Sequence, residues 1–392
     1  MNIMFVHLRN IGGVAGGLEK VVCQFANEMV SRGHAAAIVI YDDSGKPPYY
    51  RLDEKVKLIN IRERRSEPRH MGFVTKLSRE WARCRGQVEA WYEAYRDPYI
   101  LPSLKEVYKE FQPDVILNQY YSSSGFICAS KPDCPVINML HNEPKRILTN
   151  ASLRERESMA RSAVVQVLMP TFAHFIKTKM PKTPCICIPN TVKPVELAAD
   201  LSIAKDKHMI LHVGRLAKGH KRQHLLIQAF SLIADKYPQW NLEFWGDGNE
   251  EYRKELVHLI SEANLEKRVF LRGATHNILD KYLNADIFAF PSAYEGFGLA
   301  LTEAMSAGLP VIGYKSCQAC SDIIKDGETG LLAEDGATGL AEKLDILMGD
   351  QKMRIEMGHC ARKDMERFAP EKIWNQWEKV LASVVSGKMV MD

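Results

Sequence analysis

The 392-residue sequence lacks the features that would define a membrane-spanning or exported protein. No window approaches the roughly 18 consecutive apolar residues of a spanning helix. The start, Met1–His7, has neither the basic nor the apolar region of an export signal. The nine cysteines are odd in number and lack the paired spacing of a disulfide framework. We therefore expect a cytoplasmic protein with reduced thiols.

Motifs for metals are also scarce. No Asp-x-Asp occurs, and Cys317–Cys320 is the only Cys-x-x-Cys. A zinc site would need two further ligands at comparable spacing, and none is nearby. A redox or metal role for this cysteine pair is therefore the less favoured alternative, and we expect no cofactor and no metal.

The length and the charge distribution indicate two domains of different character. A chain of 392 residues exceeds what one hydrophobic core usually supports. Residues 1–195 carry 28 Lys and Arg against 19 Asp and Glu, whereas the remainder carries 24 against 29. The first half should therefore prefer anionic surroundings.

Strand and helix patterns alternate along the first half. An apolar strand, Ile3–His7, is followed by a glycine loop at 12–17, a helix at Leu18–Ser31 and a second strand at Ala36–Tyr41. This βαβ unit predicts a parallel sheet with a ligand at the carboxyl ends of its strands. Further apolar runs continue the alternation at Val115–Leu117, Val136–Leu140 and Val164–Leu168.

A second series of strands begins at Met209–Val213, which is followed by Gly214-Arg215 and a helix carrying Leu225–Phe230. Later strands are predicted at Asn241–Trp245, Val269–Leu271, Asp286–Phe290 and Val311–Tyr314. The chain is thus an α/β protein with two doubly wound, Rossmann-like domains in series. The last helix, Ile373–Val385, has Trp374 and Trp377 at helical spacing and must bury that face.

The most informative segment holds Glu295 and Glu303, with seven residues between them. Pro291 ends the preceding strand, so Glu295 should lie in a loop, and Glu303 in a helix over Leu299–Ser306. Gly296-Phe-Gly298 has little bulk, so N–H groups at the helix start can approach a phosphate. The carboxylates should face neutral hydroxyls of the same ligand, a mixture typical of a nucleotide-sugar. The plainer alternative is a solvated Glu303 beside an ordinary turn.

Positive charge for a diphosphate is expected from the loop after Met209–Val213. Arg215 follows this strand directly, and Lys221 comes six residues later. Lys218, followed by Gly219, competes with Lys221 for the same role. Each cation could alternatively be a solvated surface charge.

Residues 62–111 depart from the α/β rhythm. They combine arginines at 62, 64, 65 and 69, and again at 79, 83 and 85, with the aromatic or apolar residues Phe73, Leu77, Trp81, Trp91, Tyr92 and Tyr95. Such a pattern suits an anionic membrane surface, but it also describes a helix that packs its aromatic face on the domain. Both interpretations stay open on the sequence alone.

Together these motifs resemble those of the retaining glycosyltransferase family 4. The resemblance covers nearly the whole chain and is strongest over residues 209–335. It rests on Gly13-x-x-Gly-Gly-x-Glu19, Val213-Gly-Arg-Leu216, Trp245-Gly-Asp-Gly248 and Glu295-Gly-Phe-Gly-Leu with Glu303 and Gly308-Leu-Pro310. Two departures are that the lysine lies one residue later than usual after the arginine, and that Asp322 stands where a glutamate is usual.

The resemblance implies the GT-B architecture, with two Rossmann-like domains facing a cleft. The N-terminal, acceptor-binding domain would comprise residues 1–193 and the C-terminal, nucleotide-sugar-binding domain residues 194–370. A helical segment, 371–392, would cross back to the N-terminal domain.

The resemblance also implies roles for individual residues. Glu303 would hold the donor's ribose hydroxyls and Glu295 those of the transferred sugar, while Arg215 and Lys221 would neutralise the leaving diphosphate. The backbone of Phe297, Gly298 and Leu299 would contact the phosphates, and Gly16 and Gly17 would close onto the diphosphate from the first domain. His141 matches a histidine beside the transferred sugar, although it could equally be a hydrogen-bonded structural residue.

The expected function is metal-independent transfer, with retained configuration, of a hexose or N-acetylhexosamine from a nucleotide-sugar, a UDP-sugar as the family-level expectation. The acceptor would be a growing glycan or one linked to polyprenyl diphosphate, and the protein could be peripheral on an anionic membrane surface at the inner face of the plasma membrane. No nucleic-acid partner is expected. The alternatives are a non-catalytic binding relative and a nucleotide-dependent oxidoreductase. The glycine loop at residues 12–17 does not match the GxGxxG motif of dinucleotide-binding proteins, which disfavours the oxidoreductase.

Overall fold

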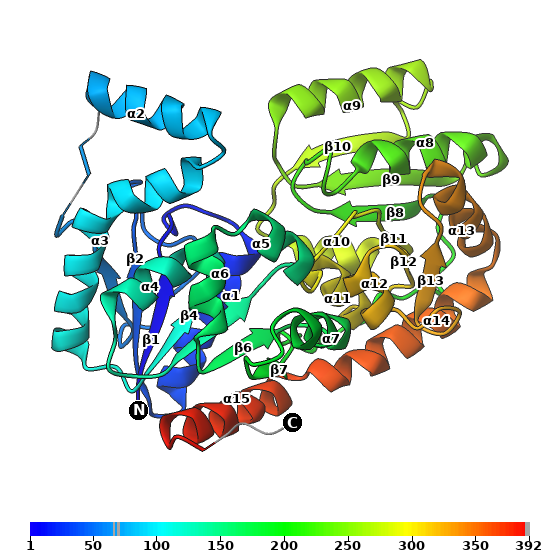
Figure 1. Ribbon diagram of the computed structural model, residues 1–392. Coiled ribbons are helices and arrows are strands. Elements are labelled where there is room, and N and C mark those ends of the chain that lie inside the picture. Colours follow the sequence, from blue (N-terminus) through cyan, green and yellow to red (C-terminus); the bar gives the residue numbers. More distant parts are fainter. Residues whose placement is uncertain (66, 69–70, 389–392) are drawn as a thin grey trace. The chain divides into compact units, whose positions relative to one another are not determined.

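The computed structural model describes residues 1–65, 67–68 and 71–388. The chain divides into two compact units, Met1–Pro189 with Trp374–Asp392, and Asn190–Ile373. Residues 389–392 of the predicted C-terminal segment lie outside the described residues. Each unit is a parallel sheet flanked by helices (Figure 1).

Unit 1 contains a seven-stranded sheet of order β3-β2-β1-β4-β5-β6-β7, in which every pairing is parallel. The central strands are largely apolar, as expected for a parallel sheet with helices on both faces. Ile3 to Val6 on β1, for example, are completely buried. The strands are β1 (Asn2–His7), β2 (Ala35–Ile40), β3 (Lys57–Asn60), β4 (Val115–Asn118), β5 (Val136–Leu140), β6 (Val164–Val167) and β7 (Cys185–Cys187).

The helices of unit 1 connect these strands and include one from the end of the chain. They are α1 (Gly17–Ser31), α2 (Phe73–Cys84), α3 (Val88–Phe111), α4 (Ser124–Ser130), α5 (Pro144–Asn150), α6 (Leu153–Ala160), α7 (Pro170–Lys179), the 3₁₀ turn η1 (Tyr121–Ser123) and α15 (Pro370–Val385), which enters the unit at Trp374.

Unit 2 contains a six-stranded parallel sheet of order β10-β9-β8-β11-β12-β13. The strand order reverses between β8 and β11, where a doubly wound sheet binds ligands. The elements are β8 (His208–Val213), α8 (Gln223–Ile233), η2 (Ala234–Lys236), β9 (Trp240–Trp245), α9 (Glu250–Glu262), β10 (Val269–Gly273), α10 (Ile278–Asn284), β11 (Ile287–Phe290), α11 (Leu299–Ser306), β12 (Val311–Tyr314), α12 (Gln318–Ile323), β13 (Gly330–Ala333), α13 (Ala337–Gly349), α14 (Gln351–Asp364) and η3 (Met365–Phe368).

The α/β alternation predicted from the sequence is confirmed. Two strands, β3 and β13, were not expected, and both have four residues. β3 is half-exposed at the sheet edge, and β13 directly follows a glycine-containing turn. β3 (Lys-Leu-Ile-Asn) and β13 (Gly-Leu-Leu-Ala) contain few of the β-branched and aromatic residues that mark the other four-residue strands.

The C-terminal helix α15 packs its tryptophans on α1. The rings of Trp374 and Trp377 lie 4.9 and 4.8 Å from the ring of Phe25. Glu378 accepts a hydrogen bond from Arg32 at 2.7 Å. Trp374 and Trp377 are buried, as the amphipathic spacing of this helix predicted. The face that carries them packs within unit 1.

The helical excursion of residues 73–111 forms the α2–α3 hairpin. Arg62, Arg64 and Arg65, which precede it, are engaged in ion pairs with Glu67, Glu110 and Glu106, respectively. Arg69, the fourth arginine of the predicted basic group, lies outside the described residues. Trp91 stacks on Tyr95 along α3 at 5.1 Å, so part of the aromatic series is used in helix packing.

None of the helices in the described part of the chain has the length and apolar character needed to cross a bilayer.

Candidate functional site

The candidate site of unit 2 is built by two loops at the strand-order reversal. Residues 214–222 follow β8, and residues 291–298 follow β11, its neighbour in the sheet. Because parallel strands end at one edge, both loops emerge together. Ala293 N–H donates to the carbonyl of His220 at 2.8 Å, which joins the two loops directly. This is where Arg215, Lys221 and Glu295 are located.

Lys221 and Glu295 form an ion pair. Lys221 Nζ lies 2.5 Å from Glu295 Oε1, and the two side chains are 14% and 11% exposed. Burial alone would raise the pKa of the Glu295 carboxyl, but the Lys221 ammonium and the His220 ring lower it to about 2. Glu295 is therefore a carboxylate at neutral pH. The sequence assigned these residues to different parts of a ligand, whereas the structure brings them into contact with each other.

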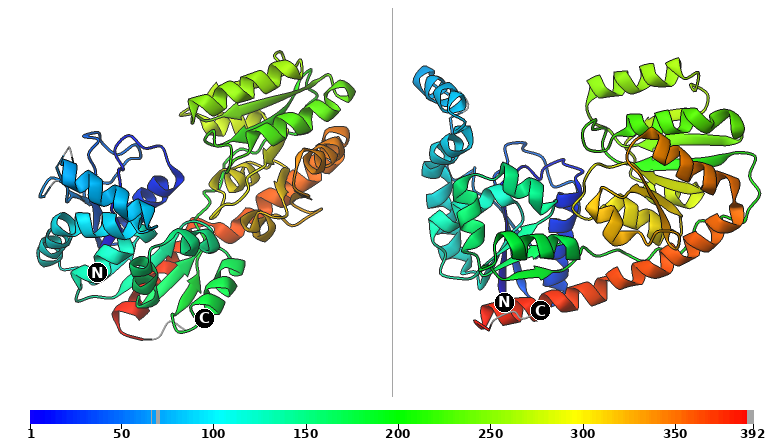
Figure 2. Two further views of the ribbon diagram at one scale, coloured as in Figure 1. Left: turned by 45° about the horizontal axis from the view of Figure 1, so that its top comes forward. Right: turned by 45° about the vertical axis from the view of Figure 1, so that its right-hand side comes forward.

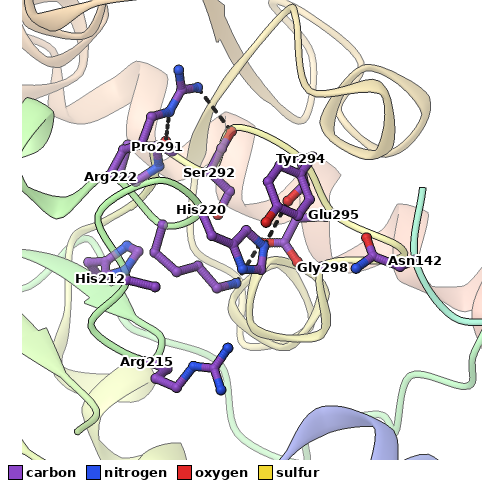
Figure 3. A network of polar contacts seen from close by, with 12 residues as sticks. Asn142, His212, Arg215, His220, Arg222, Pro291, Ser292, Tyr294, Glu295 and Gly298 are labelled. Atoms are coloured by element: carbon purple, nitrogen blue, oxygen red, sulfur yellow. Dashed lines mark hydrogen bonds and ion pairs between the residues drawn. The ribbon is translucent and has the colours of Figure 1, made fainter. Parts of the chain in front are cut away.

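His220 orients the same carboxylate. Its ring stacks on Tyr294 with centroids 4.3 Å apart, and Nε2 lies 2.9 Å from the Tyr294 carbonyl and 3.4 Å from Glu295 Oε1 (Figure 3). Both neighbours of Nε2 are acceptors, so this nitrogen carries a proton. His220 thereby fixes the position of Glu295 together with Lys221.

Arg222 connects the two loops. Its backbone is left-handed, with φ 50°. The guanidinium donates to the carbonyls of Pro291 and Ser292 at 3.1 and 3.3 Å, and it lies 4.5 Å from the Tyr314 ring centroid (Figure 3). All these contacts are internal to the protein. Arg222 is therefore a structural cation that holds the loop bearing Glu295.

A buried pair, His212 and Gln223, holds the loop after β8. Gln223 Nε2 donates to the Arg215 carbonyl at 3.0 Å and lies 3.3 Å from His212 Nε2. His212 Nδ1 lies 2.9 Å from the Ala289 carbonyl. Burial lowers the pKa of His212 to about 4, so the ring is neutral, with Nδ1 as donor and Nε2 as acceptor. The amide thus satisfies two acceptors at once.

Replacing Gln223 with glutamate should loosen this loop. A carboxylate has the same shape but cannot donate, so the Arg215 carbonyl and His212 Nε2 lose their donor. We expect unit 2 to be destabilised by about 1–3 kcal/mol, with faster hydrogen exchange over residues 214–222. Gln228→Glu is the matched control, because Gln228 is exposed on the same helix. Equal effects of the two substitutions in urea unfolding would contradict this role.

The start of α11 offers unpaired N–H groups. Gly298 caps the helix with φ 73°, a conformation that strains residues with a Cβ. No hydrogen bond within the described chain uses the N–H of Phe297 or Gly298, and the first N–H groups of any helix lack intrahelical partners. The Phe297 ring packs edge-on against Phe368 at 5.2 Å. N–H groups without a partner at the start of a helix are the donors that commonly bind an anion.

Glu303 lies in the second turn of α11, as predicted. Its Oε2 accepts a hydrogen bond from the Tyr282 hydroxyl at 3.2 Å. Tyr282 is itself buried, and burial together with the Glu303 charge raises its pKa well above the ordinary value. The tyrosine therefore stays protonated and orients the carboxylate as a donor.

Arg215 and Lys218 lie outside the buried ion pair. Arg215 is exposed, and its guanidinium makes no hydrogen bond or ion pair with the described residues. Lys218 is 61% exposed and pairs with Glu255 at 2.7 Å. Both line an open pocket of about 530 Å³ together with Leu216, Ala217, Gly248, Asn249, Glu251, Tyr252 and Glu255. Of the two competing lysines, Lys221 is the one beside Glu295.

Unit 1 places its predicted residues at its own strand-order reversal, between β1 and β4. Gly16 caps α1, and a Cβ there would lie 1.9 Å from Glu19 Oε2, so a side chain at this position would displace the Glu19 carboxylate. Gly17 is the first residue of that helix. His141 follows β5, and its Nε2 donates to Gln119 Oε1 at 3.0 Å. Burial, helped by the nearby His7 ring, lowers the pKa of His141 to about 3, so it is neutral.

Several site residues were not singled out in the sequence, namely His7, Gln119, His212, His220, Arg222, Gln223 and Tyr282. His7, Gln119 and His212 stand at or beside the carboxyl end of a strand near a reversal, and His220, Arg222 and Gln223 lie on or directly after the loop that follows β8. Tyr282 lies instead on α10 and carries no such signal.

The assignment of acceptor binding to one unit and donor binding to the other stays a prediction.

The cysteine pair is buried. Cys317 and Cys320 are both fully buried free thiols, and the hydrogen bond to Cys317 together with burial raises the pKa of Cys320 well above its ordinary value. Thiols held protonated are poor nucleophiles and poor metal ligands. Within the described residues, no three His, Cys, Asp or Glu side chains are arranged to hold a metal ion.

Residues 196–364 match the family model described as "Glycosyl transferases group 1". An uncharacterized glycosyltransferase of Haemophilus influenzae is 25% identical over 95% of this chain and 98% of its own length. An N-acetylgalactosamine-N,N'-diacetylbacillosaminyl-diphospho-undecaprenol 4-alpha-N-acetylgalactosaminyltransferase of Campylobacter jejuni is 33% identical over 43% of this chain and 45% of its own length.

The structure of Anabaena HepE in complex with UDP and glucose has a TM-score of 0.72, with 20% identity, 98% coverage of this chain and 100% of that chain. Seven further curated relatives, the Campylobacter enzyme among them, are matched by this chain over less than half of their own length. The fold is GT-B, with two parallel-sheet, Rossmann-like halves. The family model and the relatives support the assignment of this chain as a glycosyltransferase.

Proposed function

We propose that this protein is a retaining, metal-independent glycosyltransferase of family 4 that moves a hexose or N-acetylhexosamine from a UDP-sugar to a glycan acceptor. The observation that carries the proposal is the joining of the β8 and β11 loops. They place the Lys221–Glu295 pair beside the N-terminus of α11, and Arg215 on the same loop as Lys221. Cations, N–H groups and carboxylates in one place match a ligand with both phosphates and hydroxyls.

Each group suits one part of such a donor. Arg215, exposed and unpaired in the described chain, can receive the diphosphate, as can the N–H groups of Phe297–Leu299. Glu303, oriented by Tyr282, would accept hydrogen bonds from the ribose hydroxyls.

Glu295, a carboxylate held by Lys221 and His220, would accept hydrogen bonds from the transferred sugar. Lys221 then stands between the sugar and the leaving phosphate. The predicted contributions of Gly16, Gly17 and His141 to the same ligand remain part of this proposal. Because His141 is neutral, it could contact a hydroxyl but would add no charge to the phosphate.

The chemistry needs no strong base. The acceptor hydroxyl forms the new bond to the anomeric carbon on the face from which the diphosphate leaves, and the departing phosphate oxygen takes the hydroxyl proton. The protein's part is to stabilise the charge that develops on the diphosphate. We assign this task to Arg215, Lys221 and the N–H groups of α11, all of which belong to unit 2.

The names of the relatives support the substrate classes that we propose. UDP and glucose are named with the HepE structure, and an undecaprenol-diphosphate acceptor and an alpha linkage are named for the Campylobacter relative. By analogy we propose a UDP-sugar donor and a growing polysaccharide or polyprenyl-diphosphate-linked acceptor for this chain. The net positive charge of residues 1–195 suits an anionic carrier.

The test is release of free nucleotide from UDP-sugars in the presence of polyprenyl-diphosphate-linked or polysaccharide acceptors. We expect acceptor-dependent release, a product with the donor's anomeric configuration by NMR, and unchanged rates in a metal chelator. A donor that raises thermal stability without any release, across these acceptors, would favour a non-catalytic binding protein. An absorbance change from a nicotinamide would favour the oxidoreductase alternative.

A further inference from the structure

One face of α2 leaves large apolar side chains in solvent. Phe73, Val74, Leu77 and Trp81 are 76%, 78%, 55% and 58% exposed. At helical spacing these four side chains share one side of the helix. A helix that normally stabilises a globular unit buries such a face, so this exposure needs an explanation.

The opposite side of α2 is the one that packs on the protein. Ala82 is buried, and Ser78, four residues before it, accepts a hydrogen bond from Trp91 Nε1 of α3 at 3.1 Å. Figure 1 and both views of Figure 2 show α2 lying on α3 at the margin of unit 1, away from the sheet. The attachment of α2 therefore directs its apolar side outward.

Cations border this apolar face. Residues 73–85 contain four cations and a single carboxylate, Glu80. Glu80 is already paired with Arg79 at 2.7 Å and Arg83 at 2.6 Å. Arg85 lies 3.8 Å from the centroid of the Trp81 ring, so positive charge reaches the exposed aromatic itself. The helix thus joins an apolar stripe to a net positive border.

We propose that α2 is an interfacial helix that docks this protein on an anionic phospholipid bilayer. Phe73, Val74, Leu77 and Trp81 would enter the boundary between headgroups and acyl chains, and Lys76, Arg83 and Arg85 would contact the phosphates. Charge complementarity selects this occupant, because anionic lipid balances the cationic border that an apolar protein surface would leave unpaired. A single convex helix also fits a planar surface.

This inference confines the membrane interpretation of residues 62–111 to the α2 helix. Arg62, Arg64 and Arg65 are held in ion pairs within unit 1, so they are not the membrane contact proposed here. The inference also goes beyond the proposed function, since it rests on exposure and charge and not on catalysis. Binding to lipid can succeed or fail independently of transfer activity.

The first test is sedimentation of the full chain with vesicles of phosphatidylcholine alone or mixed with phosphatidylglycerol. We expect binding to the anionic vesicles and a loss of about tenfold or more in Leu77→Ser/Trp81→Ser, because both side chains leave the bilayer. Leu153→Ser, a change at a 66% exposed leucine of the same unit, is the matched control and should bind normally. Since all these side chains are exposed, unchanged thermal unfolding should confirm folding.

A second arm tests the charges. Lys76→Gln/Arg83→Gln should weaken binding to anionic vesicles by about fivefold per cation removed. Arg161→Gln/Lys182→Gln, at exposed cations elsewhere in unit 1, should have less effect. Brominated acyl chains should quench a part of the tryptophan emission that is absent in Trp81→Phe, which would place the Trp81 ring in the bilayer.

Three results would overturn the inference. The first is the absence of binding to anionic vesicles by the unaltered protein. The second is equal vesicle binding by Leu77→Ser/Trp81→Ser and Leu153→Ser. The third is a dimer in sedimentation equilibrium that dissociates in Leu77→Ser/Trp81→Ser, because a second copy would then cover the face.

Discussion

Glu295→Gln is expected to lower the rate of transfer by about 10²–10³-fold, the loss typical of removing one oriented electrostatic group from an active site. The substitution keeps the shape of the side chain but removes the charge that Lys221 and His220 hold in place. The hydroxyls of the transferred sugar would then lose a charged acceptor. Nucleotide release at saturating donor and acceptor is the measurement.

Glu255→Gln is the matched control for this variant. Glu255 pairs with Lys218 of the same loop as Lys221, but both side chains are about half exposed or more. Exposed pairs contribute little, about 0–1 kcal/mol, so this control should keep its activity. Near-normal turnover of Glu295→Gln, or an equal loss in Glu255→Gln, would contradict the assigned role. Circular dichroism should show that both variants are folded.

The local structure around Glu295 could be predicted because each signal was short-range. Pro291 ends β11, and α11 begins and ends at the residues expected, Leu299 and Ser306. Glu295 accordingly lies in a loop and Glu303 in a helix. Such features depend on capping, on proline and on periodicity, all of which are encoded within a few residues.

The contacts that position these groups could not be predicted. Lys221 and Glu295 are 74 residues apart in the chain, and they meet because β8 and β11 are neighbours in the sheet. A run of basic residues at 218–222 does not reveal which cation is buried. The structure distinguishes them, with Lys218 in solvent, Lys221 on the carboxylate and Arg222 on backbone carbonyls.

The segment 62–111 shows a different limit of prediction from sequence. Arginines and aromatics were grouped as one surface, but the structure divides them. The arginines before residue 66 are paired within unit 1, Trp91 stacks along α3, and Phe73, Leu77 and Trp81 are exposed on α2. Whether an apolar residue is exposed depends on which face of its helix packs against another element. The composition of a segment does not determine which face that is.

Lys221→Met should destabilise unit 2 as well as abolish transfer. The substitution leaves the Glu295 carboxylate 11% exposed and without its ammonium partner. Removing one partner of a buried pair costs about 3–5 kcal/mol. Lys218→Met, which breaks an exposed pair on the same loop, is the control and should cost about 0–1 kcal/mol. Urea unfolding of both variants, with hydrogen exchange to identify the unfolding unit, measures the difference.

The dependence of this loss on pH has a definite sign. In the unaltered protein the pKa of Glu295 is lowered from 4.5 to about 2, so its stabilising contribution is present above pH 4.5 and is lost as the pH falls toward 2. Without Lys221, burial should raise this pKa, and protonation then relieves the unpaired charge. The deficit of Lys221→Met should therefore shrink as the pH is lowered from 7 toward 5.

The double variant Lys221→Met/Glu295→Gln separates folding from catalysis. With both charges removed, most of the stability lost in Lys221→Met should return, because no unpaired charge stays buried. Transfer should nevertheless stay abolished, since the cation for the leaving phosphate and the acceptor for the sugar are both missing. Recovery of turnover along with stability would show that the pair only supports the fold. A double variant as unstable as Lys221→Met would instead show that the packing of the lysine side chain, which lies 4.8 Å from the Phe290 ring centroid, dominates over its charge.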